Sequence, residues 1–283
     1  MFKTQIQLLI LGLLVHTGIY GQYISRNGKI TSVVSETISS SGQIGSAEPL
    51  TVAGNIVSIL NDGLTSGRAS TSAYAIKQAF PSSTDGLYWI ANSNINSGSP
   101  FQIYADMTTD GGGWTLIMKN SNHTGWTYTN AIVLNTTIPY SNTADVINTS
   151  TVNYSIIGWA DYIKRSNSGF EYMIDATTRG GFGAIWTANG NYSFINNDNS
   201  QTNITITTKF GAWNYFPNNG ISERMPWYIN TTSRGIITTD DGSGDWWGTL
   251  ISASGAFDPS PWISISNGGP NNPNPAIMWY WVR

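Results

Sequence analysis

The chain has few acidic residues, but three of them are crowded into one short segment. Asp240, Asp241 and Asp245 fall within six residues in Thr238-Thr239-Asp240-Asp241-Gly242-Ser243-Gly244-Asp245-Trp246-Trp247-Gly248, although the whole chain has only 16 Asp and Glu residues. Carboxylates this close repel one another unless water or a cation offsets the repulsion. Aspartates interleaved with glycine and serine are typical of sharply turning loops that bind Ca²⁺ through oxygen atoms, so the segment predicts a calcium site. The spacing is not that of an EF-hand, and a solvated acidic turn is the alternative interpretation.

The residues that flank this segment add one more acid and several aromatic rings. Glu223 is the acid nearest upstream and the fourth predicted calcium ligand, with a salt bridge to Arg224 or Arg234 as its alternative role. Sugars present apolar C–H faces and polar rims, so rigid rings beside oxygen acceptors are suited to binding a glycan or an acetyl group. Most of these rings are expected in the core, because Trp is usually well buried. The predicted ligand-binding residues are Trp246, Trp247, Phe257 and Trp262, with Trp227 also nearby.

Several kinds of catalysis are excluded by composition. The chain has no cysteine and two histidines, of which His16 lies in a predicted signal peptide. A cysteine nucleophile and a zinc site of the usual His/Cys type are therefore impossible, and a Ser-His-Asp triad would have to use His123. A glycoside hydrolase needs two carboxyl groups facing each other across a cleft, and adjacent acids on one tight turn satisfy that geometry poorly. What remains is carboxylate chemistry, either oxygen ligation of a hard cation or a glycoside hydrolase using Asp240 or Asp245, which is the least favoured of the functions considered.

A second informative segment, residues 101–118, predicts two strands joined by glycines. Phe101 and Ile103 alternate with polar residues, Asp110 and three glycines follow, and the alternation then resumes from Trp114. This is the pattern of a strand, a Gly-rich connection and a second strand. Three consecutive glycines indicate a backbone with positive φ, or one too close to a neighbour to accommodate a Cβ atom.

Both segments resemble motifs of one family. The run Tyr104-Ala105-Asp106-Met107-Thr108-Thr109-Asp110-Gly111-Gly112-Gly113-Trp114-Thr115 resembles the signature Y-C-D-M-x-T-D-G-G-G-W-T that opens the fibrinogen-like C-terminal domain. The later Asp-Gly-Ser-Gly-Asp-Trp-Trp is similar to a motif beside that family's calcium and ligand pocket. In the intelectin branch, an Asp six residues before a Trp binds calcium. The resemblance thus implies Asp241 as a calcium ligand and Trp247 as a wall of a glycan site.

The resemblance also implies the fold. We expect an α+β, fibrinogen C-terminal-like domain over residues 83–283, with a central antiparallel sheet, short helices and long loops. The residues themselves predict a helix over Ala69–Phe80, capped by Ser70 or Thr71 and ended by Pro81. The almost wholly apolar end of the chain, Ala276–Arg283, predicts a strand covered on both faces. Further predicted elements are strands at 86–90, 169–175, 184–186 and 192–195 and a short helix at 157–164.

The N-terminal residues predict export. Lys3 followed by an apolar run over Ile6–Val15 reads as a signal peptide that ends at Gly21, and the run is too short to span a bilayer comfortably. We expect a secreted or cell-surface protein with no membrane span. A cysteine-free chain favours a bacterial source over a secreted animal one. Residues 22–82 are predicted to form a leader or stalk.

The resemblance implies a non-catalytic, lectin-like recognition protein, so we predict that the protein is not an enzyme. The net charge of −3, with no basic patch, argues against nucleic acid. The predicted partner is a glycan or an acetylated small molecule held beside calcium. The alternative is a structural or adhesive extracellular protein that self-assembles into a homo-oligomer through its leader.

Overall fold

The computed structural model describes residues 50–52, 55–57, 61–121, 146, 154–196, 198, 200–211, 226–228, 235–238, 247–250, 260–263 and 277–283, and the structural statements below concern these residues. Within them, no helix is long and apolar enough to cross a membrane. The predicted signal peptide and most of the predicted leader lie outside the described residues.

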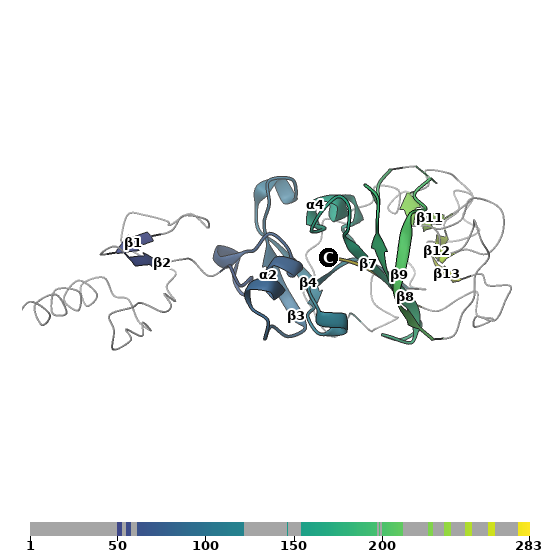
Figure 1. The fold of residues 1–283 in the computed structure, drawn as a ribbon, viewed down its shortest axis with the longest axis horizontal. Helices are drawn as coiled ribbons and strands as arrows, with labels where there is room; N and C mark the ends of the chain where they lie inside the picture. The colour runs from purple at the N-terminus through teal and green to yellow at the C-terminus, as the bar shows by residue number, and fades with distance from the viewer. Residues whose placement is uncertain are drawn as a thin grey trace, which may run out of the picture.

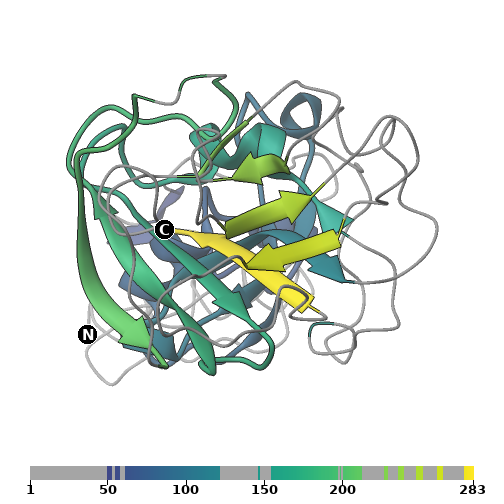
Figure 2. The ribbon, with the colours of Figure 1, turned by 90° about the vertical axis from the view of Figure 1, so that its right-hand side faces the viewer.

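One large antiparallel sheet dominates the fold (Figures 1 and 2). Its strands follow the order β3-β4-β5-β14-β7-β8-β9, and the short β6 pairs with β5 beside this path. The bounds are β3 Gly86–Ile90, β4 Phe101–Asp106, β5 Trp114–Ser121, β6 Tyr154–Ser155, β7 Glu171–Ala176, β8 Phe182–Ala188, β9 Ile204–Phe210 and β14 Ile277–Val282. Because β14 comes from the end of the chain yet lies between β5 and β7, its pairing joins the two halves of the sheet.

A second, four-stranded antiparallel sheet lies over β14 in Figure 2. It has the order β10-β11-β12-β13, with bounds β10 Trp227–Tyr228, β11 Gly235–Thr238, β12 Trp247–Leu250 and β13 Ser260–Ile263. A separate pair, β1 Leu50–Val52 and β2 Asn55–Val57, forms a small hairpin near the N-terminus. The α+β class with a mainly antiparallel sheet is therefore confirmed.

The helical elements are short. They are η1 Ser66–Arg68, α2 Ala73–Ala79, η2 Asn96–Gly98, η3 Thr109–Gly111, η5 Ile157–Trp159 and α4 Ala160–Ile163. The predicted helix within 69–80 is confirmed as α2, although its cap is Ser72, whose Oγ accepts a hydrogen bond from the Ala75 N–H at 3.1 Å. Such a cap satisfies one of the N–H groups that have no partner within the helix. The predicted short helix at 157–164 corresponds to η5 and α4.

The predicted central strand is also confirmed. Every residue of β14 is buried, and Tyr280 and Met278 point to the side of the sheet that faces β12, because the Tyr280 hydroxyl lies 3.2 Å from Thr249 Oγ1. The alternate residues Trp279 and Trp281 lie on the opposite face, under the Arg179 guanidinium. A strand apolar on both faces can occupy such a position, since each face is covered by other elements.

One predicted strand is wrong. Residues 192–195 form no strand, with Phe194 and Ile195 in a bend, and the edge strand beside β8 is β9 instead. Side chains from α4 and the residue after it bind the backbone here: Lys164 Nζ donates to the Tyr192 carbonyl, and the Phe194 N–H donates to Asp161 Oδ1 at 3.3 Å. Tyr192 and Phe194 are still buried, so the aromatic pattern reports core packing rather than strand pairing.

Candidate functional site

Most of the predicted site residues lie outside the described part of the chain. These are Glu223, Asp240, Asp241, Asp245, Trp246 and Phe257, together with His123. Trp247 is the first residue of β12 and Trp262 belongs to β13, and these two strands are antiparallel neighbours in which Trp247 pairs with Ile263 and Gly248 with Trp262. The structure therefore places the backbone of two predicted ligand-binding residues side by side.

The acidic segment connects two paired strands. Thr238, the last residue of β11, pairs with Gly248 near the start of β12. The residues between them, which include Asp240, Asp241 and Asp245, thus leave and re-enter the sheet at neighbouring positions. Ile237 and Thr249 are buried on these strands, so the two ends of the segment are anchored in the interior.

The four-stranded sheet is fixed to the large sheet. The Thr249 hydroxyl of β12 and the Tyr280 hydroxyl of β14 lie 3.2 Å apart and are both buried, and β13 contacts β5. Burial raises the pKa of Tyr280 well above its ordinary value, so this phenol stays neutral and keeps its proton for a hydrogen bond. The strand that follows the Gly triplet and the strands that flank the acidic segment are consequently parts of one packed body.

The Gly triplet has the backbone that its sequence predicts. Gly111, Gly112 and Gly113 have φ values of 84°, 75° and 83°. A Cβ atom on Gly112 would lie 2.1 Å from the Met107 carbonyl oxygen, and one on Gly113 would lie 3.1 Å from Tyr74 Cα in α2. Both predicted reasons for glycine, positive φ and close approach, are therefore confirmed.

Arg283 holds this turn against the sheet. Its Nη1 donates to the carbonyls of Asp110 at 2.6 Å and Gly112 at 2.8 Å, and its Nη2 lies 3.0 Å from Asp110 Oδ2. Its Nε lies 2.8 Å from Glu171 Oε2, and the guanidinium lies 4.1 Å from the centre of the Trp114 ring. The planar guanidinium uses its fixed fork of donors and its face at once, which an ammonium group could not do.

A second charged cluster lies on the same face of the sheet. Arg179 follows β7 and bridges two buried carboxylates: its Nη2 lies 2.6 Å from Asp106 Oδ2 and its Nε 3.0 Å from Asp175 Oδ2. The guanidinium also lies 4.2 Å from the centre of the Trp281 ring. This cluster ties β4 to β7, although these strands are not neighbours in the sheet.

The two carboxylates of this cluster have opposite pKa shifts. Burial outweighs the charge of Arg179 and raises the pKa of Asp175 to about 6. Burial also acts to raise the pKa of Asp106, but hydrogen bonds from Thr109, the charge of Arg179 and a hydrogen bond from Thr108 together place it below its ordinary value. Asp175 is therefore the group in this cluster that changes charge near neutral pH.

The described part of the chain contains no group of three or more His, Cys, Asp or Glu residues that could hold a metal ion. Asp106, Asp175 and Glu171 are engaged by arginines, so their roles are structural. The sequence did not predict the Arg179 and Arg283 clusters, because each joins residues that are far apart along the chain. The one signal of such a cluster in the sequence was Arg283, a cation at the end of a predicted buried strand.

Comparison with known proteins gives matches among solved structures. No protein-family model matches this sequence, and no curated protein is a significant match. Among solved structures, the chain is similar to the fibrinogen-like globe domain of human ANGPTL6, with 11% identity, a TM-score of 0.36, and coverage of 75% of this chain and 94% of that chain. It is also similar to the fibrinogen-like globe domain of human ANGPTL2, with 10% identity, a TM-score of 0.39, and coverage of 75% and 98%.

Proposed function

We propose that this protein is an extracellular recognition protein that binds a glycan or an acetylated group at segment 239–246, beside a calcium ion. The observation that carries the proposal is the pairing of Thr238 with Gly248, which confines three carboxylates to a short connection between neighbouring strands. Oxygen-rich, turning connections of this kind suit Ca²⁺, which accepts six to eight oxygen ligands in flexible geometry.

Five of the predicted residues have a stated role in this proposal. Asp241 is the principal ligand, and Asp240, Asp245 and Glu223 are the further carboxylates. A bound cation would supply the positive charge that offsets their mutual repulsion. Trp247 provides an apolar wall for a sugar ring or an acetyl methyl group. The anchoring of β12 through Thr249 and Tyr280 supplies the rigid base that such a site needs.

The test is glycan-array binding of the secreted chain in millimolar calcium and in EGTA, for the wild type and for Asp241→Asn. We expect binding in calcium, with at least a tenfold loss in EGTA and in Asp241→Asn. Asp198→Asn is the matched control, because Asp198 is an exposed acid whose described partners are the N–H and hydroxyl of Ser200. Equal binding in EGTA and in Asp241→Asn would contradict the proposal.

A negative array still discriminates between the alternatives. If no glycan or acetylated probe binds and the full chain forms oligomers at the same concentration with and without calcium, the structural or adhesive function is favoured. Sedimentation velocity of the full chain in both buffers measures this directly.

A further inference from the structure

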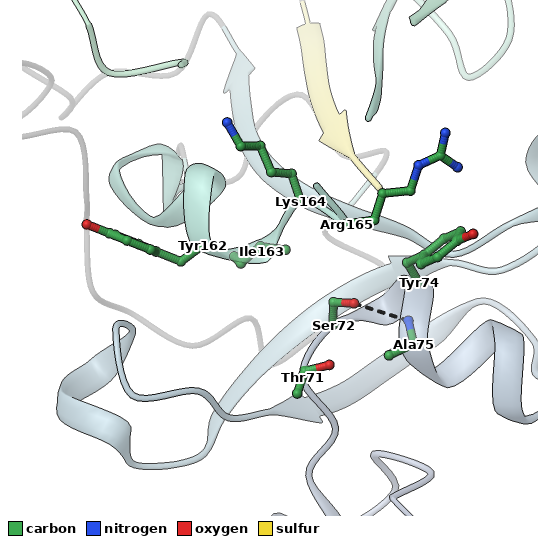
Figure 3. A pocket seen from close by; sticks show the side chains of 8 residues that line it. All are labelled: Thr71, Ser72, Tyr74, Ala75, Tyr162, Ile163, Lys164 and Arg165. Carbon is green, nitrogen blue, oxygen red and sulfur yellow. Dashed lines mark hydrogen bonds between the residues drawn. The ribbon is translucent and has the colours of Figure 1, made fainter. Parts of the chain in front are cut away.

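The pocket of about 330 Å³ between α2 and α4 singles out no ligand. Its two cations are already paired: Lys164 Nζ lies 3.1 Å from Asp161 Oδ1. Arg165 Nη1 lies 3.2 Å from Glu171 Oε2. Figure 3 shows the Tyr162 ring directed away from the pocket. A more informative group of residues lies where β8 ends.

The end of β8 has a sequence that favours a spontaneous reaction. Asn189 directly follows Ala188, the last residue of β8, and Gly190 comes next. Within the described residues this is the only asparagine followed by glycine. Glycine has no Cβ atom to hinder the approach of its backbone nitrogen to the side-chain carbonyl carbon of the preceding asparagine. Such a pair therefore loses the asparagine amide more readily than other asparagine pairs.

Both reacting groups are accessible in the folded chain. Asn189 is exposed and Gly190 is half-buried. Among the described residues, the Gly190 N–H has no hydrogen-bond acceptor, whereas the N–H of Asn189 donates to the Asn203 carbonyl at 2.9 Å. The Gly190 nitrogen can thus lose its proton to hydroxide without first giving up a hydrogen bond.

The Asn189 side chain is held by the start of β9. Its Nδ2 donates to Thr205 Oγ1 at 2.8 Å and to Asn203 Oδ1 at 3.4 Å. β9 is the last strand of the large sheet and pairs only with β8 in that sheet. Because the ends of edge strands open locally at a small cost in free energy, this bridge breaks transiently in the folded protein. The bridge therefore sets how often the side chain is free to react.

We propose that Asn189 is a site of spontaneous deamidation whose rate is controlled by its bridge to β9. The Gly190 nitrogen attacks Asn189 Cγ and forms a new C–N bond. The bond from Cγ to Nδ2 breaks, and Nδ2 leaves as ammonia together with the proton from the Gly190 nitrogen. One water molecule then opens the five-membered succinimide at either carbonyl. Opening at one carbonyl gives aspartate, and opening at the other gives isoaspartate.

Both products weaken the contact between β8 and β9. A carboxylate has no N–H to donate, so the bond to Asn203 Oδ1 is lost and two oxygen acceptors face each other. Isoaspartate also lengthens the main chain by one carbon atom, which displaces the backbone from its register with β9. Ile204 and Ile206 of β9 pack partly buried against the core, so a loosened strand exposes them. Deamidation is thus a slow, irreversible step that loosens the edge of the sheet.

The test is peptide mass spectrometry of the full chain after incubation, folded, at 37 °C and pH 8. Labelling by isoaspartyl methyltransferase distinguishes isoaspartate from aspartate. We expect Asn189 to convert to a mixture of the two, at least fivefold faster than Asn167. Asn167 is the internal control, because it is also exposed but precedes Ser168, whose side chain hinders the attack.

A pair of threonine variants tests the bridge. Conversion of Asn189 should be at least threefold faster in Thr205→Val, which removes an acceptor of Nδ2. It should stay within twofold of the wild type in Thr207→Val. Thr207 is the matched control, because it is an exposed threonine of the same strand whose hydroxyl donates to the Ile185 carbonyl instead.

Unfolding provides the reference rate. In urea, where the bridge is absent, Asn189 should convert at least threefold faster than in the folded wild type, and Thr205→Val should then have no effect. Conversion of folded Asn189 that is no faster than that of Asn167 would overturn the proposal. Equal rates in the folded wild type and in Thr205→Val would also overturn it, because the bridge would then not control the reaction.

Discussion

Replacing Gly112 with alanine, and comparing it with two alanine replacements outside the triplet, provides a graded test of the Gly-triplet turn. Gly112 has φ +75° and ψ −164°, a region open essentially to glycine alone, and a Cβ atom there would lie 2.1 Å from the Met107 carbonyl oxygen. Gly180 also has positive φ, +67°, but a Cβ there would meet no atom within 4 Å. Gly86 has neither constraint. The three positions thus separate backbone strain from steric clash.

The expected effects differ in sign and size. Gly86→Ala should raise the free energy of unfolding by up to about 1 kcal/mol, because alanine reduces the conformational freedom of the unfolded chain. Gly180→Ala should lower it by roughly 1–2 kcal/mol, the cost of an L-residue in left-handed backbone. Gly112→Ala should lower it by about 3–5 kcal/mol, since the collision with Met107 adds to the strain. That loss is a large share of a typical stability of 5–15 kcal/mol.

Urea unfolding followed by tryptophan fluorescence measures all three variants. A linear fit for each gives the free energy of unfolding, and equal slopes show that the same surface is exposed in each case. If Gly112→Ala costs no more than Gly180→Ala, the close approach of Gly112 to Met107 is not a constraint on the turn and this interpretation of the triplet is wrong.

Three further predictions concern stability. Arg283→Met should lower the free energy of unfolding by about 3–5 kcal/mol in the same urea assay, because it removes the cation from a buried set of contacts that includes Glu171; a loss below 1 kcal/mol would contradict this role. Tyr280→Phe should cost about 1–3 kcal/mol, since the buried Thr249 hydroxyl loses its partner, and a Thr249→Val, Tyr280→Phe double variant should recover part of that loss. The pKa of Asp175 is raised to about 6 in the folded state, so its contribution to stability is complete below about pH 4 and is lost as pH rises through 6. This decline in the free energy of unfolding, up to about 3 kcal/mol, should be absent in Asp175→Asn. Parallel pH profiles of the wild type and the variant would refute the prediction.

Much of the scaffold could be predicted because its signals are local. The alternation before and after Gly111–Gly113 predicts β4 and β5, and the apolar run at the end of the chain predicts β14 as a central strand. In each case, neighbouring residues along the chain contain the pattern, and the packing follows from it. The predicted helix within 69–80 was likewise local, although the cap proved to be Ser72.

The features that could not be predicted depend on long-range contacts. Arg179 and Asp106 are 73 residues apart in sequence, and no spacing rule joins them. The segment 192–195 has the alternation of a strand, but its backbone groups bind the side chains of Asp161 and Lys164 rather than a neighbouring strand.

We propose that segment 239–246 binds calcium in the folded protein. Thermal unfolding of the purified chain in 5 mM calcium and in EGTA measures whether it does, with Asp241→Asn studied in both buffers. A ligand that binds only the folded state must raise the midpoint in proportion to its binding free energy. We expect calcium to raise the wild-type midpoint by several degrees and to leave the Asp241→Asn midpoint unchanged. A wild-type midpoint that is the same in calcium and in EGTA would contradict the claim.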